Sequence, residues 1–179
     1  MKIKIRLMNW ENMNKQGIPH DAINVMKFFN LGLKKDAYPY VPRKSKITSD
    51  EIKKNWIPGR NRNISIIAEI KGKIVGSGTV LIDKNSNKYS KESRREPNEY
   101  AITIHPDNFD RGIGTKITKK ELEEVKKRSI FFQGHIAQKN IRAIRMMEKL
   151  GYKPSKVIKS YKRFEDAGII GKVYLYKFP

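Results

Sequence analysis

One stretch of the chain, residues 98–116 (NEYAITIHPDNFDRGIGTK), combines two closely spaced glycines with a change in hydrophobic periodicity. Its first part, Glu99–Ile104, is rich in the β-branched and aromatic residues that favour strands. After a turn-rich segment, apolar residues recur at helical spacing from Ile113 onward, so Gly112 and Gly114 lie at a strand-to-helix junction. Glycine lets the backbone approach a ligand, and a helix N-terminus favours negative charge. The junction could therefore bind a phosphate group, although a tight turn without a ligand would need the same glycines.

A second segment, residues 140–152, has the pattern of a short amphipathic helix. It begins at Asn140, a residue type favoured at helix N-caps, and stops at Gly151, which is followed by Tyr152. The two segments together resemble the GNAT superfamily of acyl-CoA N-acyltransferases. In that family the phosphate loop reads R/Q-x-x-G-x-G/A, and the later helix reads N-x-x-A-x-x-x-Y-x-x-x-G-F/Y. The resemblance covers roughly residues 60–155.

This resemblance implies that the chain binds acetyl-CoA as a co-substrate. In the family, the fourth strand splays from its neighbour and pairs with the pantetheine arm, and the loop after it takes the pyrophosphate. Asn140 matches a family residue that commonly reaches the cofactor arm, and its residue type also suits a helix N-cap. The residues that would contact acetyl-CoA are Ile102, Thr103, Ile104, Phe109, Asp110, Arg111, Gly112, Ile113, Gly114, Thr115, Asn140 and Met147.

The chain departs from the family pattern at two of these positions. Phe109 stands where the family usually has Arg or Gln, and we expect binding to survive because the loop binds mainly through N–H groups. Met147 stands at the position of a tyrosine that often protonates the leaving thiolate. Tyr100, Tyr152 or water could replace that tyrosine. Alternatively no acid is needed, because a thiol of pKa near 8.5 is a tolerable leaving group.

Acetyl transfer to an amine requires a neutral nucleophile, because an ammonium group has no lone pair. Positioning supplies much of the rate, and a positioned base contributes about 10² to 10⁴-fold. Glu99 begins the strand before the glycine-rich loop and resembles the catalytic glutamate of family members that include protein-lysine acetyltransferases. We therefore predict that Glu99 is the general base. The alternative is a strand-end carboxylate paired with Lys or Arg, and Glu69 is less well placed for the role.

The rest of the chain predicts the elements that hold these segments. Residues 2–7 alternate between charged and apolar, which predicts a half-buried first strand with Ile3, Ile5 and Leu7 facing inward. Further strands are expected at residues 64–70, 74–82, 99–104, 129–137, 152–164 and 172–178. The first two of these form a hairpin. With the resemblance, the pattern predicts an α/β fold, a GNAT-like mixed, mostly antiparallel sheet of about seven strands flanked by helices.

Two helices and one long polar segment are also expected. Residues 21–33 place apolar side chains at helical spacing, and Thr48–Glu51 has the form of a capping box that opens a helix including Trp56. Residues 83–97 are nearly all polar, which predicts a solvated loop. Its lysines and arginines could hold an anionic partner, or the loop is an ordinary exposed connection.

Length and composition limit the class of protein. A chain of 179 residues predicts a single domain, here an N-acetyltransferase domain over residues 1–179. With no cysteine and three histidines, disulfides, a thiol nucleophile and thiolate metal sites are excluded, and no metal is expected. No apolar run approaches the length of a membrane span, and the first ten residues alternate where a signal peptide would be continuously apolar. We expect a cytoplasmic protein with no membrane partner.

The charge balance bears on the partner that supplies the amine. The 39 basic and 18 acidic residues give a net charge of +21, and such a field attracts polyanions while it repels polycationic amines. A biased genomic composition would produce the same excess. We expect the acceptor to be a protein lysine or N-terminus on an anionic or ribonucleoprotein surface. The alternatives are a small-molecule amine, or a basic module that binds nucleic acid or the ribosome and has a degenerate acyl-CoA site.

Overall fold

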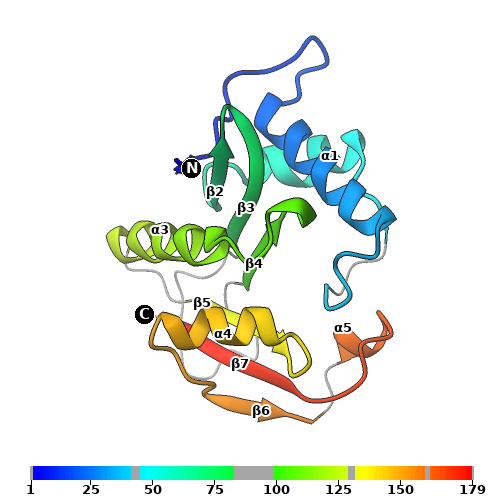
Figure 1. Ribbon diagram of the computed structural model, residues 1–179. Helices are drawn as coiled ribbons and strands as arrows, with labels where there is room; N and C mark the ends of the chain where they lie inside the picture. The colour runs from blue at the N-terminus through cyan, green and yellow to red at the C-terminus, as the bar shows by residue number, and fades with distance from the viewer. Residues whose placement is uncertain (1, 42–44, 83–98, 129–131, 160–161, 179) are drawn as a thin grey trace.

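The computed structural model describes residues 2–41, 45–82, 99–128, 132–159 and 162–178 (Figure 1). Its strands form one sheet in the order β1-β2-β3-β4-β5-β7-β6. Their bounds are β1 (Lys4–Leu7), β2 (Ile64–Ile70), β3 (Lys73–Leu81), β4 (Glu99–Ile104), β5 (Phe132–Ala137), β6 (Lys156–Ile158) and β7 (Val173–Phe178). Neighbouring strands run antiparallel except β4 and β5, which run parallel. The predicted mixed, mostly antiparallel sheet is confirmed.

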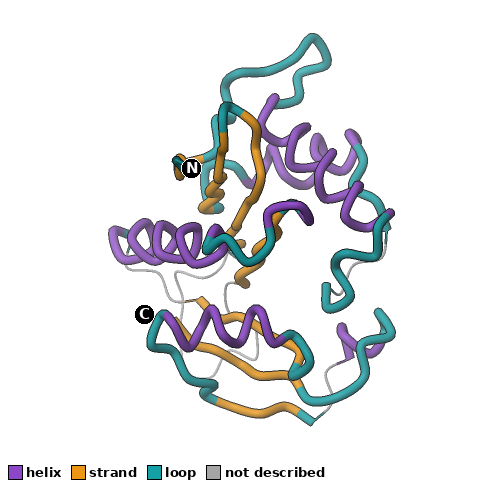
Figure 2. Tube along the Cα trace, in the orientation of Figure 1, coloured by secondary structure: helices purple, strands orange, loops and turns teal. Residues whose placement is uncertain are grey.

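Helices cover both faces of the sheet (Figure 2). Their bounds are α1 (His20–Lys34), α2 (Ser49–Glu51), η1 (Ile52–Trp56), η2 (Ile57–Gly59), η3 (Pro106–Asn108), α3 (Ile113–Lys127), α4 (Ile141–Lys149) and α5 (Lys162–Glu165). On β2, Ile64 and Ile66 pack in the cluster that includes α3 and α4. The next residue, Ile67, packs with α1 instead. Because strand side chains alternate between faces, α3 and α4 share one face and α1 covers the other.

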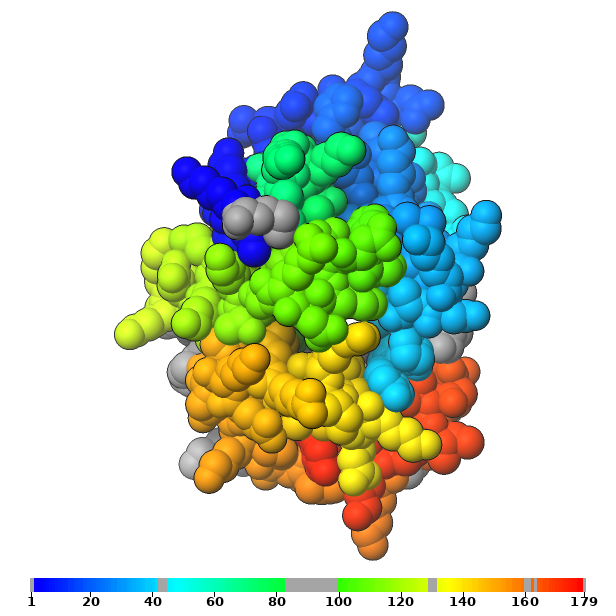
Figure 3. Space-filling view, in the orientation of Figure 1, coloured from blue at the N-terminus to red at the C-terminus, as the bar shows by residue number. Residues whose placement is uncertain are grey.

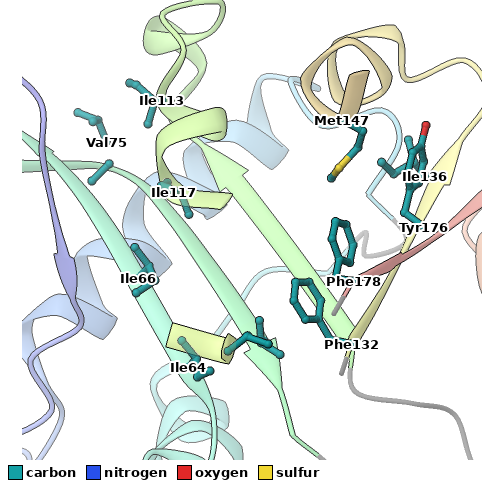
Figure 4. Packing of buried hydrophobic residues seen from close by; sticks show 13 residues of the cluster. Ile64, Ile66, Val75, Ile113, Ile117, Phe132, Ile136, Met147, Tyr176 and Phe178 are labelled. Carbon is teal, nitrogen blue, oxygen red and sulfur yellow. The ribbon is translucent and has the colours of Figure 1, made fainter. Parts of the chain in front are cut away.

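The main core joins the two halves of the sheet to α3 and α4 (Figure 4). Ile117 of α3 and Met147 of α4 are completely buried in it. On the β5 and β7 side, the rings of Phe132 and Phe178 stack with centroids 4.4 Å apart. Burying each such side chain contributes about 1.5 to 3 kcal/mol, so this cluster holds both helices firmly against the sheet.

Local signals account for several element boundaries. The hairpin between β2 and β3 turns at Lys71 and Gly72, which have φ values of 50° and 76°. Both residues are left-handed, as a two-residue hairpin of type I′ requires. Thr48 caps α2, since its Oγ1 accepts from the N–H of Glu51 at 3.2 Å. The helix opened there continues as a π-helical turn that includes Trp56, as the sequence predicted for that residue.

Two details of the sequence prediction are wrong. Leu7 is 46% exposed; β1 is an edge strand, so a neighbouring strand shields it on one side only. Among the described residues of the segment 152–164, the strand is β6, which pairs with three residues of β7, and the residues from Lys162 onward form the helix α5. The predicted polar loop at 83–97 and the first residues of the predicted strand at 129–137 lie outside the described residues.

Candidate active site

Among the described residues, the parallel strands β4 and β5 share one residue pair. Their ladder consists of Glu99 opposite Gln133, whereas β4 pairs with β3 along six residues. The N–H of His105 donates to a carbonyl of β3 at 2.8 Å. Since hydrogen bonding alternates along an antiparallel pair, Ile102 and Ile104 direct their N–H and C=O groups away from β3, toward the divergence. The backbone groups of Ile102 and Ile104 therefore face the gap between β4 and β5, and their pairing with a pantetheine arm stays a prediction.

The loop after β4 presents unpaired backbone donors. Gly112 is the N-cap of α3 with φ 70° and ψ 9°, and no side chain caps the helix. Within the described residues, the N–H groups of residues 112–115 have no hydrogen-bond partner. A Cβ at Gly112 would meet nothing within 4 Å, so the left-handed backbone alone requires glycine here. Four free donors at the positive end of a helix form a cradle for an anion.

The side chain of Phe109 lies between the loop and α4. Arg142 of α4 places its Cζ 4.8 Å from the centroid of the Phe109 ring. The same guanidinium donates from Nε to Asp110 Oδ2 at 3.2 Å. On the other side, the ring of Tyr38 meets Phe109 edge-on at 6.3 Å. The loop after β4 is thus tied by side chains both to α4 and to the segment after α1.

Tyr38 lies at one end of the β4 edge that faces the gap between β4 and β5. Its hydroxyl donates to the carbonyl of Ile104 at 2.9 Å, and its ring stacks on Phe29 at 5.4 Å. The ring fills the space over Gly32, where a Cβ would lie 2.0 Å from it. Burial raises the pKa of Tyr38 above its ordinary value, so the hydroxyl stays protonated and keeps donating. The space-filling view shows the surface hollowed where this segment, the phosphate loop and the start of α4 meet (Figure 3).

The structure places the other predicted cofactor residues around this loop. Ile102, Thr103, Ile104, Gly114 and Thr115 are half-buried, whereas Asp110 and Arg111 are exposed and Arg111 lies 3.4 Å from Asn108 Oδ1. The side chain of Ile113 belongs to the core, so only its N–H faces the cradle.

The residues predicted on α4 divide between the helix cap and the core. Asn140 caps α4, since its Oδ1 accepts from the N–H of Ala143 at 3.2 Å, which confirms the predicted cap. Its Nδ2 has no partner among the described residues and could donate to a ligand. Met147 points into the core toward Tyr176 and Phe178 (Figure 4). The cofactor roles of Asn140 and Met147 stay predictions.

Glu99 begins β4, with its backbone opposite Leu81 of β3 and Gln133 of β5. It therefore stands where β4 and β5 separate, and its assignment as the base stays a prediction. The alternative carboxylate, Glu69, is already engaged, because Arg6 donates from Nε to its Oε1 at 2.9 Å. A guanidinium therefore already occupies an oxygen of the Glu69 carboxylate.

A buried polar group on α3, against β3, was not predicted. Both carboxylate oxygens of Glu121, on α3, are buried without a hydrogen-bond partner in the described structure. Burial raises the pKa of Glu121 well above its ordinary value. Nearby, the hydroxyls of Tyr100 and Thr118 contact each other, and Thr118 also donates to the carbonyl of Gly114 at 3.0 Å. The sequence did carry a signal, because Glu121 lies four residues after the apolar Ile117 on the helix.

A family model of the acetyltransferase (GNAT) family matches residues 32–152. The match covers more than half of the chain, and the chain belongs to this family. An uncharacterized N-acetyltransferase from Methanocaldococcus jannaschii is 30% identical over 110 residues, which are 60% of this chain and 47% of the relative. The chain thus spans about half the length of the curated relative that it matches.

Solved structures share the fold over nearly the whole chain. One is yncA, a putative acetyltransferase from Salmonella typhimurium solved with its cofactor acetyl-CoA, at a TM-score of 0.72 and 14% identity over 98% of this chain and 92% of that one. Another is a ribosomal-protein-alanine N-acetyltransferase from Brucella melitensis, at a TM-score of 0.72 and 15% identity over 97% of this chain and 98% of that one. In the described part of this chain, no helix is long and apolar enough to cross a membrane.

Proposed function

We propose that the protein transfers an acetyl group from acetyl-CoA to a primary amine. The observation that carries the proposal is the set of unpaired N–H groups at residues 112–115, directly after a strand whose outer edge is open. A pyrophosphate would take those donors, and the pantetheine arm would lie along Ile102 and Ile104. Family membership and the similarity to a structure that holds acetyl-CoA support this reading.

The reaction needs one proton acceptor and one good leaving group. The amine nitrogen bonds to the thioester carbonyl carbon, its proton passes to the carboxylate of Glu99, and the C–S bond breaks to release the CoA thiolate. Water, or the hydroxyl of Tyr152, returns a proton to the thiolate. Tyr152 and Tyr100 are both half-buried, but the hydroxyl of Tyr100 already contacts Thr118, so Tyr152 is the better placed tyrosine.

Calorimetry with acetyl-CoA tests the proposal directly. We expect the purified protein to bind acetyl-CoA with micromolar affinity, and Gly112→Ala to weaken binding about tenfold. An alanine at a left-handed position costs about 1 kcal/mol and tilts the N–H groups of the cradle. Gly17→Ala is the matched control, because Gly17 also has a positive φ and open space around it but lies far along the chain. No binding at millimolar acetyl-CoA would refute the proposed activity.

The net charge of the protein favours one class of acceptor amine. A surface with a net charge of +21 steers an amine on an anionic body toward the site and repels polycations. We propose a lysine or N-terminus on an anionic protein or ribonucleoprotein, and hence a cytoplasmic location. That the Brucella melitensis neighbour bears the name of a ribosomal-protein-alanine N-acetyltransferase agrees with this choice. The competing candidates are a small-molecule amine and a nucleic-acid-binding module that transfers no acetyl group.

Salt dependence separates these acceptors. We expect transfer to an acidic protein or ribosomal particle to slow by at least tenfold between low salt and about 0.5 M salt, where the Debye length falls to a few ångströms. At low salt, transfer to spermidine should be slower than transfer to the acidic protein. This difference in rate should disappear as the salt concentration rises. Rates of CoA release measure both reactions. Faster transfer to spermidine, with no salt penalty on the protein, would mean that the charge does not select the acceptor.

A further inference from the structure

We propose that Arg142 is a pyrophosphate-binding residue, and that Phe109 is the platform that holds its guanidinium over the phosphate loop. This inference rests on the proposed function and names a residue outside the loop itself. Phe109, in the loop that leads to Gly112, offers no side-chain donor to a ligand. Arg142 of α4 brings a guanidinium beside it, with Cζ 4.8 Å from the centroid of the Phe109 ring.

The orientation of this guanidinium leaves its distal end available. Nε donates to Asp110 Oδ2 at 3.2 Å, and Cζ lies over the Phe109 ring. Across the residues that the structure describes, neither Nη1 nor Nη2 of Arg142 has a partner. Those two nitrogens form the fork that binds phosphate oxygens in a bidentate manner. Because stacking and the Nε hydrogen bond already restrict the side chain, little rotational freedom remains to be lost on binding.

The positive charge of Arg142 also offsets the negative charge of Asp110 in this loop. Asp110 adds a negative charge to a loop that would receive a pyrophosphate, and like charges repel. A cation between the two offsets that repulsion, and its pairing with Asp110 persists while the fork contacts the ligand. The cradle then contains four backbone donors from residues 112–115 and one charged fork from α4. It joins α4 to α3 through the bound anion.

The test compares three variants in acetyl-CoA calorimetry. Arg142→Ala should raise the dissociation constant about tenfold, the scale of one lost charge-assisted hydrogen bond. Arg145→Ala is the matched control, since Arg145 is an exposed arginine of α4 with no interaction in the described structure, and it should bind like the natural protein. The double variant Phe109→Arg with Arg142→Ala returns the guanidinium to the loop and should recover affinity to within about threefold. Thermal unfolding confirms that each variant is folded.

Two further ligands identify the group that Arg142 contacts. Dephospho-CoA keeps the pyrophosphate but lacks the 3′-phosphate, so Arg142→Ala should weaken it by the same factor. Acetyl-pantetheine has no phosphate, and its kcat/KM should be equal in both proteins. Equal binding of acetyl-CoA by Arg142→Ala and Arg145→Ala would overturn the inference, as would a loss that disappears with dephospho-CoA. If the natural protein bound no acetyl-CoA at all, the proposed function itself would fail.

Discussion

Glu121→Met should raise the free energy of unfolding at pH 5 by about 2 kcal/mol, the scale of removing a buried polar group without partners. Glu121 is fully buried, and both its carboxylate oxygens are unpaired within the described structure. The carboxyl group packs against the backbone of Gly78, where an added Cβ would lie 2.5 Å from Oε1. Methionine is unbranched and flexible, so it fills the same space without a polar head.

The gain should grow with pH. Burial raises the pKa of Glu121, so the folded protein holds this proton more tightly than the unfolded chain does. The stability that the protonated Glu121 carboxyl group contributes is therefore fully present below the unfolded pKa near 4.5, and it is lost as the pH rises toward the folded pKa. Across that window the natural protein loses about 1.4 kcal/mol per pH unit from this group, and Glu121→Met abolishes the loss. Urea denaturation at pH 5, 6 and 7 measures the difference between the two proteins.

Glu124 on the same helix supplies a control of opposite sign. Hydrogen bonds from Lys127 and Lys120 lower the pKa of Glu124, so its contribution is present above the unfolded pKa and is lost as pH falls. The loss of unfolding free energy caused by Glu124→Gln should therefore become smaller in acid. The gain in unfolding free energy from Glu121→Met should also become smaller in acid, because the Glu121 carboxyl group is then protonated in both the folded and the unfolded state. A pH-independent difference for Glu121→Met would show that Glu121 is ionised in the folded protein.

Glu99→Gln should lower kcat by about 10² to 10⁴-fold, the contribution of a positioned base. The amide keeps the size of the side chain but cannot accept the proton of the amine. The loss should be greatest at low pH, where most of the acceptor is ammonium, while the affinity for acetyl-CoA stays unchanged. Initial rates between pH 6 and 9, with calorimetry alongside, measure both effects.

The matched control for this variant is Glu11→Gln, which alters an exposed glutamate outside the sheet. It removes the same charge and should leave rate and pH profile unaltered. If Glu99→Gln behaved like Glu11→Gln, Glu99 would be a structural carboxylate, and the base would be another group or the solvent.

Local patterns were sufficient to predict most of the sheet. The strands β2, β3 and β4 and the turn at Lys71 and Gly72 follow from alternation and turn chemistry, which act between near neighbours in the chain. The exposure of Leu7 depends on which strand forms the edge, and the start of α5 depends on how far β6 pairs with β7. Both are set by tertiary pairing that no local pattern contains.

Some residues of the candidate site could also be predicted from local sequence, and others could not. Gly112 could be identified because its role depends on its own backbone conformation, with φ 70°. Tyr38 and Arg142 could not, since one bonds a carbonyl 66 residues away and the other stacks on a ring from a different element. Sequence spacing gives no information on contacts between two loops, so these residues emerge only from the packed structure.

In the described part of the chain, β4 and β5 share one residue pair, so the sheet backbone there forms two hydrogen-bonded blocks, one of β1, β2, β3 and β4 and one of β5, β7 and β6. Across that division cohesion depends on side chains, such as Tyr100 against Phe132 at 5.7 Å. In amide hydrogen exchange, the N–H groups of Ile102 and Ile104 should therefore exchange faster than those of Ala101 and Thr103, which bond to β3. A ligand that bonds along this edge would slow Ile102 and Ile104 selectively, and so report its own position residue by residue.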